Sequence, residues 1–516
     1  MSAERAKGEA PVPATSRRSL DRVGRLAIRY VLTSFGFLFL GGLAAWTMRL
    51  EVNQVVHPNA DLYDALMTFH GLVMFLGFAG MTVMGASLYV LARAFQGRLR
   101  WYVLAETAYW LMTAGCLEVL VATVFMNFGA SWVFLYPLAF HPADAWGPAA
   151  TFVFELGVVL MGLSIIAYGL VCALTATLPR PEDPGRPWPS RLAQAVGLGY
   201  LFPSRFGGRD YPLVAVPLAV NGIDMVIATL PLALLLIENL LQVLIPSLRV
   251  DPLLAKNVLW FFGHPVVYLL LFPAVAVAYQ IVAEDTKRPI PAGPFVGFAW
   301  ALALVVNITV WAHHIYIDFP NGSSQAVINT IAEPLTYSIT LPSVVSIVAI
   351  VLTFLAARPS WGLPMKFTIA AVFSWLVAGF SGVVNATPAL DETVHNTMWV
   401  VGHFHNMALL NVGFVGFAGA YYLVPKLTGR SFVNPRLGDV HLWGSVVGGY
   451  LMVLPWLLEG LEGLPRRVIT TPSSMDWLNW IFLLGLAVFT IVQLAFAWNL
   501  FRTLRGPQVK AVPAAA

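Results

Sequence analysis

Twelve long apolar stretches, separated by short polar segments, run along this chain. Each is long enough for an α-helix to cross the hydrocarbon core of a bilayer, which takes about 20 residues. The polar segments between them are marked by proline, glycine and charge, as at 179–191 and 284–294. We therefore predict an all-α fold, a polytopic membrane protein of about twelve transmembrane helices. The expected spans are residues 25–48, 64–92, 101–126, 147–178, 213–245, 257–282, 293–314, 326–356, 366–388, 396–425, 438–460 and 476–503.

The composition agrees with this pattern. Of 516 residues, 58% are hydrophobic and 11% are charged, whereas soluble domains have about 25% charged residues. The net charge of +4 is too small to suggest a nucleic-acid partner. The two cysteines, Cys116 and Cys172, lie inside apolar stretches, so we expect neither a disulfide scaffold nor a thiolate metal site.

Basic residues indicate how the chain is oriented. Of its 30 Lys and Arg, 25 lie in the N-terminal segment, in the loops after even-numbered spans, or after the last span. Because cytoplasmic loops carry the excess of Lys and Arg, both termini should be cytoplasmic in a prokaryotic cell membrane. We expect one membrane domain, 25–503, between cytoplasmic tails at 1–24, predicted to be disordered, and 504–516. The five exceptions are Arg49, Arg249, Lys256, Arg466 and Arg467.

Six of the ten histidines fall inside predicted spans. An ionisable residue at membrane depth is costly and is by default a candidate for function, although any single one could be a hydrogen-bonded packing residue. With both termini inside, all six lie in the outer third of the membrane, which predicts one layer of metal ligands. They are His70, His264, His313, His314, His403 and His405.

Spacing sorts these histidines into groups. His403 and His405 are two residues apart, so on a helix their side chains point about 200° apart and serve different metals. His313 and His314 are adjacent at the end of a span, where both can reach one ion.

A further histidine is paired with a tyrosine. His264 and Tyr268 are four residues apart and share a helix face, and Pro265 should fix the turn that presents His264. Imidazole ligands without thiolate suit copper or zinc.

Four segments together resemble subunit I of the haem–copper oxidases, the catalytic subunit of cytochrome c oxidase. They occur in the family's order, and the twelve-span layout covers nearly the whole chain. The segments are TFHGLVM (68–74), WFFGHPVVYLLLFP (260–273), WAHHIY (311–316) and HNTMWVVGHFHN (395–406).

The resemblance implies a role for each ligand and for the tyrosine. His70 and His405 would be the axial ligands of a low-spin haem, expected to be type B. His403 would be the single axial ligand of a high-spin haem, type A or O-like. One copper ion would be held by His264, His313 and His314, with Tyr268 linked covalently to a copper ligand. The implied activity is reduction of dioxygen to water, coupled to proton uptake and translocation.

Two arginines among the outer exceptions match the family's pair that binds haem propionates, Arg466 and Arg467. A guanidinium suits a carboxylate bidentately. The resemblance also places Asp391 and His395 near the propionates, although a solvated loop acid and histidine would look the same.

The proton path points to one branch of the family. The main branch has a glutamate just after the His-Pro of span 6 and acids near the loop after span 2. Here Val266 holds the first position and residues 93–102 contain no acid. The chain therefore resembles the B-type branch, with one path ending at Tyr268.

Candidate hydroxyls for that path are Tyr279, three helical turns beyond Tyr268, and Ser343 with Ser346 in span 8. Val275 departs from the family, which often has a tyrosine there, so water or another side chain must bridge the gap. Serine hydroxyls in membrane helices also bond preceding carbonyls with no further role.

The electron donor is left open. The chain has no dithiolate copper site and no c-type haem attachment motif. We expect a second subunit with a dinuclear copper centre that accepts electrons from cytochrome c, or else a quinol site.

Two alternatives remain. A nitric oxide reductase on the same fold typically lacks the tyrosine, uses iron in place of copper and adds glutamates. A twelve-span transporter would carry acids and broken helices at the midplane.

Overall fold

The computed structural model describes residues 14–207, 209–315 and 323–507. Its described residues form helices joined by turns and loops, with two isolated β-bridges and no strand. Twelve helical segments are long and apolar enough to cross a membrane. The predicted all-α, twelve-span architecture is therefore confirmed.

The first six spans come from the N-terminal half. Their helices, with three short helices (α6, α7 and α8) between the fourth and fifth spans, are α1 (Ala14–Val52), α2 (Ala60–Leu72), η1 (Val73–Gly80), α3 (Met81–Ala94), α4 (Tyr102–Leu120), η2 (Val121–Phe125), η3 (Leu138–Phe140), α5 (Pro148–Ala176), α6 (Trp188–Ala195), α7 (Leu198–Leu201), α8 (Pro203–Phe206), α9 (Ala215–Leu244), α10 (Pro252–Gly263) and α11 (Pro265–Thr286).

The last six spans follow. Their helices, with α16 and η6 outside the spans proper or at a span's start, are α12 (Pro294–Thr309), η4 (Val310–Ile315), α13 (Ser323–Ser338), α14 (Thr340–Leu355), α15 (Leu363–Ala386), α16 (Pro388–Val394), α17 (Met398–His405), η5 (Asn406–Gly413), α18 (Phe414–Thr428), α19 (Pro435–Leu461), η6 (Ser473–Met475) and α20 (Asp476–Arg505).

The ends of the membrane domain differ from the predicted boundaries. Helix α1 begins at Ala14, inside the segment 1–24 that was expected to be a disordered tail. The stretch from there to Arg25 contains four arginines, and arginine is a good helix former, so the helix extends beyond the apolar pattern. Helix α20 ends at Arg505, two residues beyond the predicted 503. The remaining residues of both expected tails, 1–13 and 508–516, lie outside the described part of the chain.

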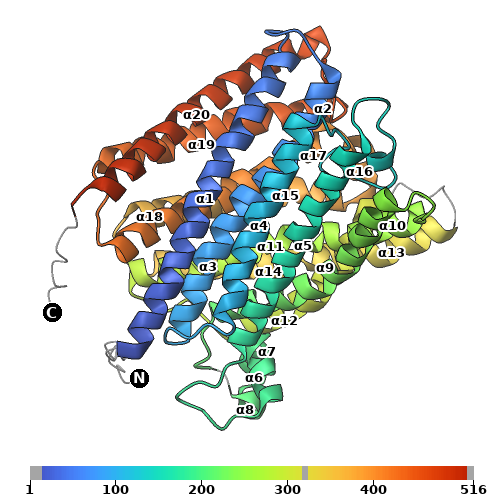
Figure 1. Ribbon diagram of the computed structural model, residues 1–516. Coiled ribbons are helices and arrows are strands. Elements are labelled where there is room, and N and C mark those ends of the chain that lie inside the picture. The colour runs from blue at the N-terminus through green and yellow to red at the C-terminus, as the bar shows by residue number, and fades with distance from the viewer. Residues whose placement is uncertain (1–13, 208, 316–322, 508–516) are drawn as a thin grey trace.

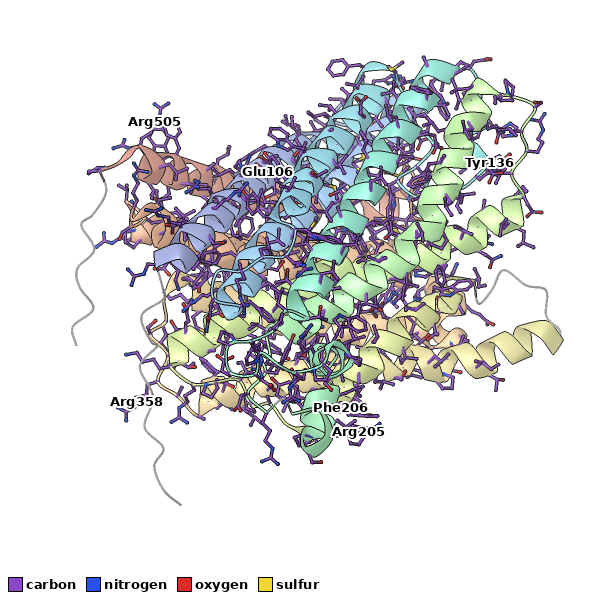
Figure 2. All side chains as sticks on the ribbon, turned by 60° about the horizontal axis from the view of Figure 1, so that its bottom comes forward. Glu106, Tyr136, Arg205, Phe206, Arg358 and Arg505 are labelled. Atoms are coloured by element: carbon purple, nitrogen blue, oxygen red, sulfur yellow. The ribbon has the colours of Figure 1, made fainter. Side chains whose placement is uncertain are left out.

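The helices pack as one inclined bundle (Figure 1). The first turn of α1, the last turn of α20 and the short helices α6 to α8 lie toward one end, whereas α2, α10 and α16 lie toward the other. Arg358 and Arg505 lie at the left of Figure 2 and Arg205 at its bottom, whereas Tyr136 lies at the right. The placement of these arginines agrees with the asymmetry of basic residues along the sequence.

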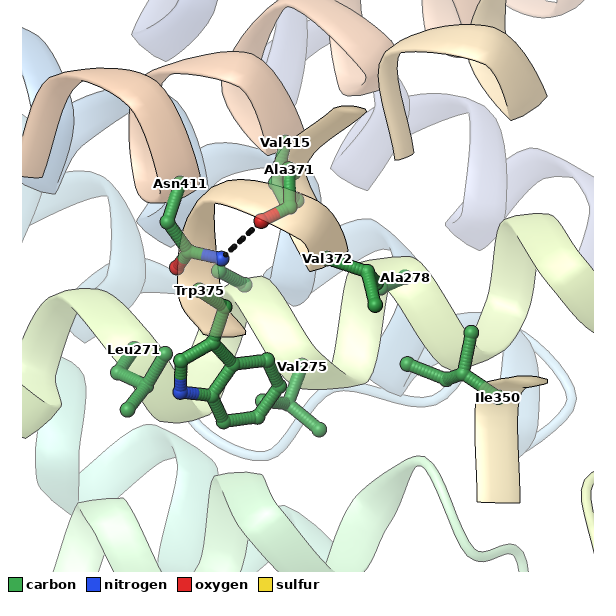
Figure 3. A pocket seen from close by; sticks show the side chains of 10 residues that line it. Leu271, Val275, Ala278, Ile350, Ala371, Val372, Trp375, Asn411 and Val415 are labelled. Atoms are coloured by element: carbon green, nitrogen blue, oxygen red, sulfur yellow. Dashed lines mark hydrogen bonds between the residues drawn. The ribbon is translucent and has the colours of Figure 1, made fainter. Parts of the chain in front are cut away.

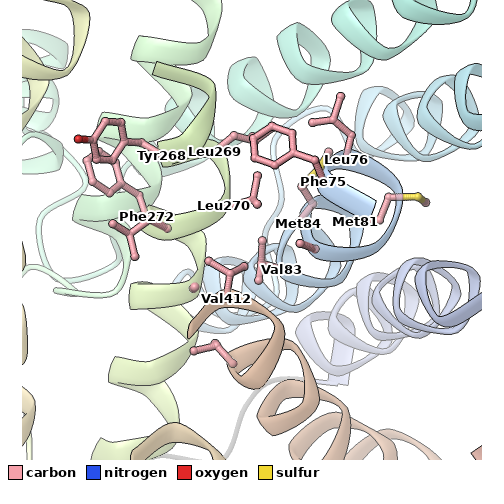
Figure 4. Packing of buried hydrophobic residues seen from close by; sticks show 14 of the residues in the cluster. Phe75, Leu76, Met81, Val83, Met84, Tyr268, Leu269, Leu270, Phe272 and Val412 are labelled. Carbon is pink, nitrogen blue, oxygen red and sulfur yellow. The ribbon is translucent and has the colours of Figure 1, made fainter. Parts of the chain in front are cut away.

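Small residues let several spans approach closely. A Cβ added at Gly169 of α5 would lie 2.7 Å from the carbonyl oxygen of Gly222 in α9, and one at Gly115 of α4 would lie 2.6 Å from that of Gly157 in α5. Such contacts between small residues are a usual basis of helix association in membranes. Around α11 the packing is instead apolar, against η1, α3 and η5 (Figure 4).

The backbone is irregular at, or within a few residues of, the predicted ligand histidines. His264 separates α10 from α11, and Pro265 takes the first position of α11, where its missing N–H costs nothing. The adjacent pair His313 and His314 lies in the 3₁₀ turn η4. The π-helices η1 and η5 follow closely after His70 and His405, and such π segments are frequent at functional sites.

Candidate metal centres

Three imidazoles from two spans form a compact cluster. One ligand nitrogen from each of His264, His313 and His314 lies within 4.8 Å of the others. His264 Nδ1 is 3.2 Å from His314 Nε2. Two nitrogens bound to one tetrahedral metal at about 2 Å each would be roughly 3.3 Å apart. The cluster therefore has the donor set and spacing of a three-histidine copper or zinc site.

Neighbouring side chains fix the rings of this cluster. The Tyr268 hydroxyl is 3.0 Å from His264 Nε2, one helical turn away. His313 Nδ1 is 3.2 Å from the Thr336 hydroxyl, and Trp260 stacks on His314 with ring centroids 4.2 Å apart and planes 10° apart. Contacts of this kind orient metal-binding imidazoles and set which nitrogen faces the ion.

A second pair of histidines faces one another across the bundle. The ring centroids of His70 and His405 are 6.1 Å apart, with planes 16° apart. His70 Nδ1 is 2.9 Å from the Gly41 carbonyl oxygen, and His405 Nδ1 is 2.9 Å from that of Val401. Two bonds of about 2 Å to a shared metal would separate two such rings by roughly 6 Å. With each Nδ1 committed to a carbonyl, the two Nε2 atoms are free to face a metal ion between the rings.

His403 points away from that pair. Its Nδ1 is 2.9 Å from the hydroxyl of Ser381 in α15. A Cβ added at Gly382 would lie 3.0 Å from His403 Cε1, so this glycine makes room for the ring. His403 and His405 therefore face different neighbours, as their two-residue spacing predicts.

The two outer arginines lie in the loop between α19 and α20. The Arg466 backbone N–H donates to the Asn396 carbonyl oxygen at 2.9 Å, and Arg466 Nη2 donates to Asn396 Oδ1 at 2.5 Å. Arg466 Nε is buried and has no hydrogen-bond partner among the described residues. The pKa of Arg466 is lowered to about 10, chiefly by burial and then by the charge of Arg467, with Asp391 acting in the opposite direction. An orphaned buried N–H on a guanidinium suits a further carboxylate, such as a propionate.

Asp391 and His395 lie together near Arg466. His395 Nδ1 is 2.8 Å from Asp391 Oδ2, and Asp391 is buried. Burial also lowers the pKa of Arg467, against a smaller effect of Asp64 that raises it. The structure thus brings the four predicted propionate-region residues into one area.

The candidate proton path is only partly connected by protein groups. The Tyr279 hydroxyl donates to Ser346 Oγ at 2.9 Å, and both residues are fully buried. Ser343, one turn earlier in α14, is half-buried. Val275 lines a small cavity of about 10 Å³ together with Asn411 (Figure 3). Asn411 Nδ2 donates to the Ala371 carbonyl oxygen at 2.9 Å, whereas its Oδ1 has no partner among the described residues.

Several residues near these sites were missed from the sequence. Ser381, Gly382 and Asn411 are ordinary membrane-helix residues, so their positions became visible only in the fold. Asp224 did carry a signal, because it is an acid in the middle of an apolar span.

Fold and site together define a polytopic membrane protein with a three-histidine metal cluster and a separate facing histidine pair. The family described as Cytochrome C and Quinol oxidase polypeptide I matches residues 25–488. The chain belongs to this family, the subunit I of the haem–copper oxidases. It is therefore a multi-pass oxidoreductase of a family that binds haems and copper, acts on oxygen and generally works with other subunits.

Three relatives illustrate the range of the family. A probable cytochrome c oxidase subunit 1-beta of Nocardia farcinica is 27% identical over 94% of this chain and 80% of its own length. A haem–copper oxidase subunit I+III of Aeropyrum pernix is 29% identical over 90% of this chain and 54% of its own length. A quinol oxidase subunit 1 of Bacillus spizizenii is 25% identical over 93% of this chain and 72% of its own length.

The fold agrees with a solved structure. A haem–copper terminal oxidase dimer, determined by electron cryo-microscopy, superposes with a TM-score of 0.77 at 20% identity, covering 95% of this chain and 85% of the other.

Proposed function

We propose that this subunit reduces dioxygen to water in a respiratory chain of a prokaryotic cell membrane and couples the reaction to proton translocation. The observation that carries the proposal is the convergence of His264, His313 and His314 within 4.8 Å, with the Tyr268 hydroxyl 3.0 Å from His264. A haem iron and a copper bound here would supply dioxygen binding and most of the electrons.

The histidines divide among three metals in this proposal. His70 and His405 hold the iron of a low-spin haem, and His403 holds the iron of a high-spin haem. The copper ion is held by the cluster of His264, His313 and His314. Two contacts support this division. The ring of His405 faces that of His70, whereas His403 Nδ1 forms a hydrogen bond with the Ser381 hydroxyl. The low-spin haem is proposed to be type B and the high-spin haem type A or O-like.

Tyr268 supplies a proton, and with it an electron, to the reacting oxygen. Cleaving dioxygen in one step takes four electrons and a proton, and a buried phenol beside the copper ligands can provide one electron and the proton from Oη. Apolar packing around Tyr268, including Phe272 with ring centroids 4.9 Å away, excludes bulk water. A positioned general acid of this kind contributes roughly 10²–10⁴-fold to a rate.

The outer loop binds the haem propionates through Arg466 and Arg467. The orphaned Arg466 Nε supports this assignment, since a propionate oxygen would supply its missing acceptor. Asp391 and His395, joined by their 2.8 Å contact, would lie near the propionates of a bound haem and take part in proton exit.

Protons reach Tyr268 from the cytoplasmic side through Ser343, Ser346 and Tyr279. A water in the cavity beside Val275 would continue the path. The cavity is about the size that one water needs, and Asn411 Oδ1 offers it a hydrogen-bond acceptor.

A second subunit with a dinuclear copper centre is proposed to deliver electrons from cytochrome c, with both termini of this chain in the cytoplasm. A quinol is the alternative donor, since relatives of both kinds exist. Nitric oxide reduction is not favoured, because Tyr268 is present beside His264 and the predicted span 257–282 contains no glutamate.

The test is to purify the complex with its partner subunits and measure metal content, haem spectra and oxygen consumption. Two haems and three copper ions per complex are expected, one copper in subunit I and two in the partner's dinuclear centre, with oxygen uptake from reduced cytochrome c. A preparation without haem absorption would refute the proposal. Uptake from quinol alone would reassign the donor.

A further inference from the structure

A buried carboxyl near the start of α5 has no part in the proposed function. Glu155 lies about two turns inside this helix, which begins at Pro148, and its side chain is fully buried. Neither Oε1 nor Oε2 of Glu155 has a hydrogen-bond partner among the described residues. An ionised carboxylate without a counter-charge is costly in apolar surroundings. Glu155 therefore requires either a proton or a cation.

Two glycine contacts show how α9 is aligned with α5, beside which it lies (Figure 1). A Cβ added at Gly169 would lie 2.7 Å from the Gly222 carbonyl oxygen, and one added at Gly162 would lie 3.7 Å from Thr229 Cγ2. Seven residues back along α5 thus correspond to seven residues forward along α9. The two helices are antiparallel, and the alignment can be continued toward the start of α5.

One more step of seven residues places Glu155 level with Leu236 of α9, and two polar side chains follow within two turns. Asn239 and Gln242 are both buried, and the Asn239 side chain lies beside the Glu155 carboxyl. Side chains on a helix lean toward the N-terminus of that helix. Because the helices are antiparallel, Glu155 leans toward the level of Asn239. Asn239 and Gln242 in turn lean back toward the level of Glu155.

Four oxygen atoms of these three side chains have no hydrogen-bond donor among the described residues. Besides the two carboxyl oxygens of Glu155, they are Asn239 Oδ1 and Gln242 Oε1. Asn239 also lines a cavity of about 10 Å³ between α9, α10 and the loop that carries Tyr136. A cavity of this size holds about one water. The contact between α5 and α9 therefore offers four oxygen ligands and room for a water beside them.

A proton on Glu155 does not account for all four atoms. It would serve the carboxyl oxygen that carries it and Asn239 Oδ1, which could accept from it. The other carboxyl oxygen and Gln242 Oε1 would still have no donor, and each unsatisfied buried acceptor carries a desolvation cost. A cation among the three side chains would contact every one of these oxygens. Hard cations take carboxylate, amide carbonyl and water oxygens as ligands.

We propose that Glu155, Asn239 and Gln242 bind one monovalent alkali cation, such as Na⁺, at the contact of α5 and α9. One carboxylate balances one positive charge, which favours a monovalent ion over a divalent one. A water in the cavity beside Asn239 completes the oxygen shell. The ion ties the start of α5 to the end of α9 and so stabilises the folded subunit. This site goes beyond the proposed oxidase function and does not depend on it.

The test measures the thermal unfolding of the purified complex in sodium chloride and in choline chloride at equal ionic strength. Because a ligand that binds only the folded state stabilises it, Na⁺ should raise the unfolding midpoint by about 2 °C or more. Glu155→Gln removes the charge and keeps the shape, and it should unfold at the same temperature in both salts. Asp224→Asn is the matched control. It removes another fully buried carboxyl, on α9 itself, and should keep the effect of Na⁺.

Equilibrium dialysis with radioactive sodium gives a direct readout. The wild type and Asp224→Asn should bind more sodium than Glu155→Gln. Equal binding by the wild type and Glu155→Gln would overturn the site. An infrared band of a protonated carboxyl, present in the wild type in sodium chloride and lost in Glu155→Gln, would show that a proton takes the place of the ion. If Glu155→Gln does not assemble, equal unfolding temperatures of the wild type in the two salts would overturn the proposal.

Discussion

Replacing Tyr268 by phenylalanine should nearly abolish oxygen reduction while leaving the protein folded. The change removes one hydroxyl, 3.0 Å from His264 Nε2, and leaves the ring and its packing on Phe272 intact. One intramolecular hydrogen bond contributes about 1 kcal/mol, against a typical domain stability of about 5–15 kcal/mol. The variant should therefore assemble with both haems and the copper. Its turnover should fall by roughly 10²-fold or more, the contribution expected of a lost general acid.

The assay is oxygen consumption per haem, together with a reduced-minus-oxidised spectrum and copper analysis of the same preparation. Tyr168→Phe is the matched control, since Tyr168 is also fully buried and hydrogen bonded, at 2.7 Å to Ser87. Tyr168→Phe should lose about as much stability as Tyr268→Phe, and its turnover should stay at the wild-type level. Near-normal turnover of Tyr268→Phe, with metals retained, would refute the role of the phenol. Equal losses in both variants would show that stability alone is responsible.

Further expectations concern the haem sites and the proposed proton path. His405→Ala should lose the low-spin haem spectrum and retain copper; loss of copper with both haems kept would reverse the assignment. Gly382→Val should displace His403, because even a Cβ there lies 3.0 Å from its ring, and the carbon monoxide difference spectrum of the high-spin haem should shrink; an unchanged spectrum would contradict this. Tyr279→Phe should slow turnover several-fold with metals unchanged, and equal turnover would exclude the path. Arg466→Gln should lower a haem midpoint potential by roughly 40 mV, since removing a charge worth about 1 kcal/mol disfavours the added electron; an unchanged potential in redox titration would exclude propionate contact.

Much of the architecture follows from local rules. Spans are readable because a helix in lipid must be apolar for about 20 residues. Pro265 marks the break between α10 and α11, because proline has no N–H to donate and its ring clashes with the preceding turn of a helix. The shared face of His264 and Tyr268, and the opposed directions of His403 and His405, are consequences of 3.6 residues per turn. Helix ends were less well predicted, as the start of α1 at Ala14 shows, because a helix continues past the apolar stretch where propensity allows.

What the sequence determined by itself is the set of spans, the candidate ligands and the helix faces on which they lie, since each depends on neighbours within a turn or two. The tertiary structure decided which of these residues meet. His70 faces His405 across 335 positions of the chain, and Asp224 pairs with Asn307 across 83. The π-helix after His405, the space at Gly382 and the orphaned Arg466 Nε likewise arise from packing between distant spans. Periodicity contains no information about such contacts, because it reports which face of a helix is apolar and not which helix will cover it.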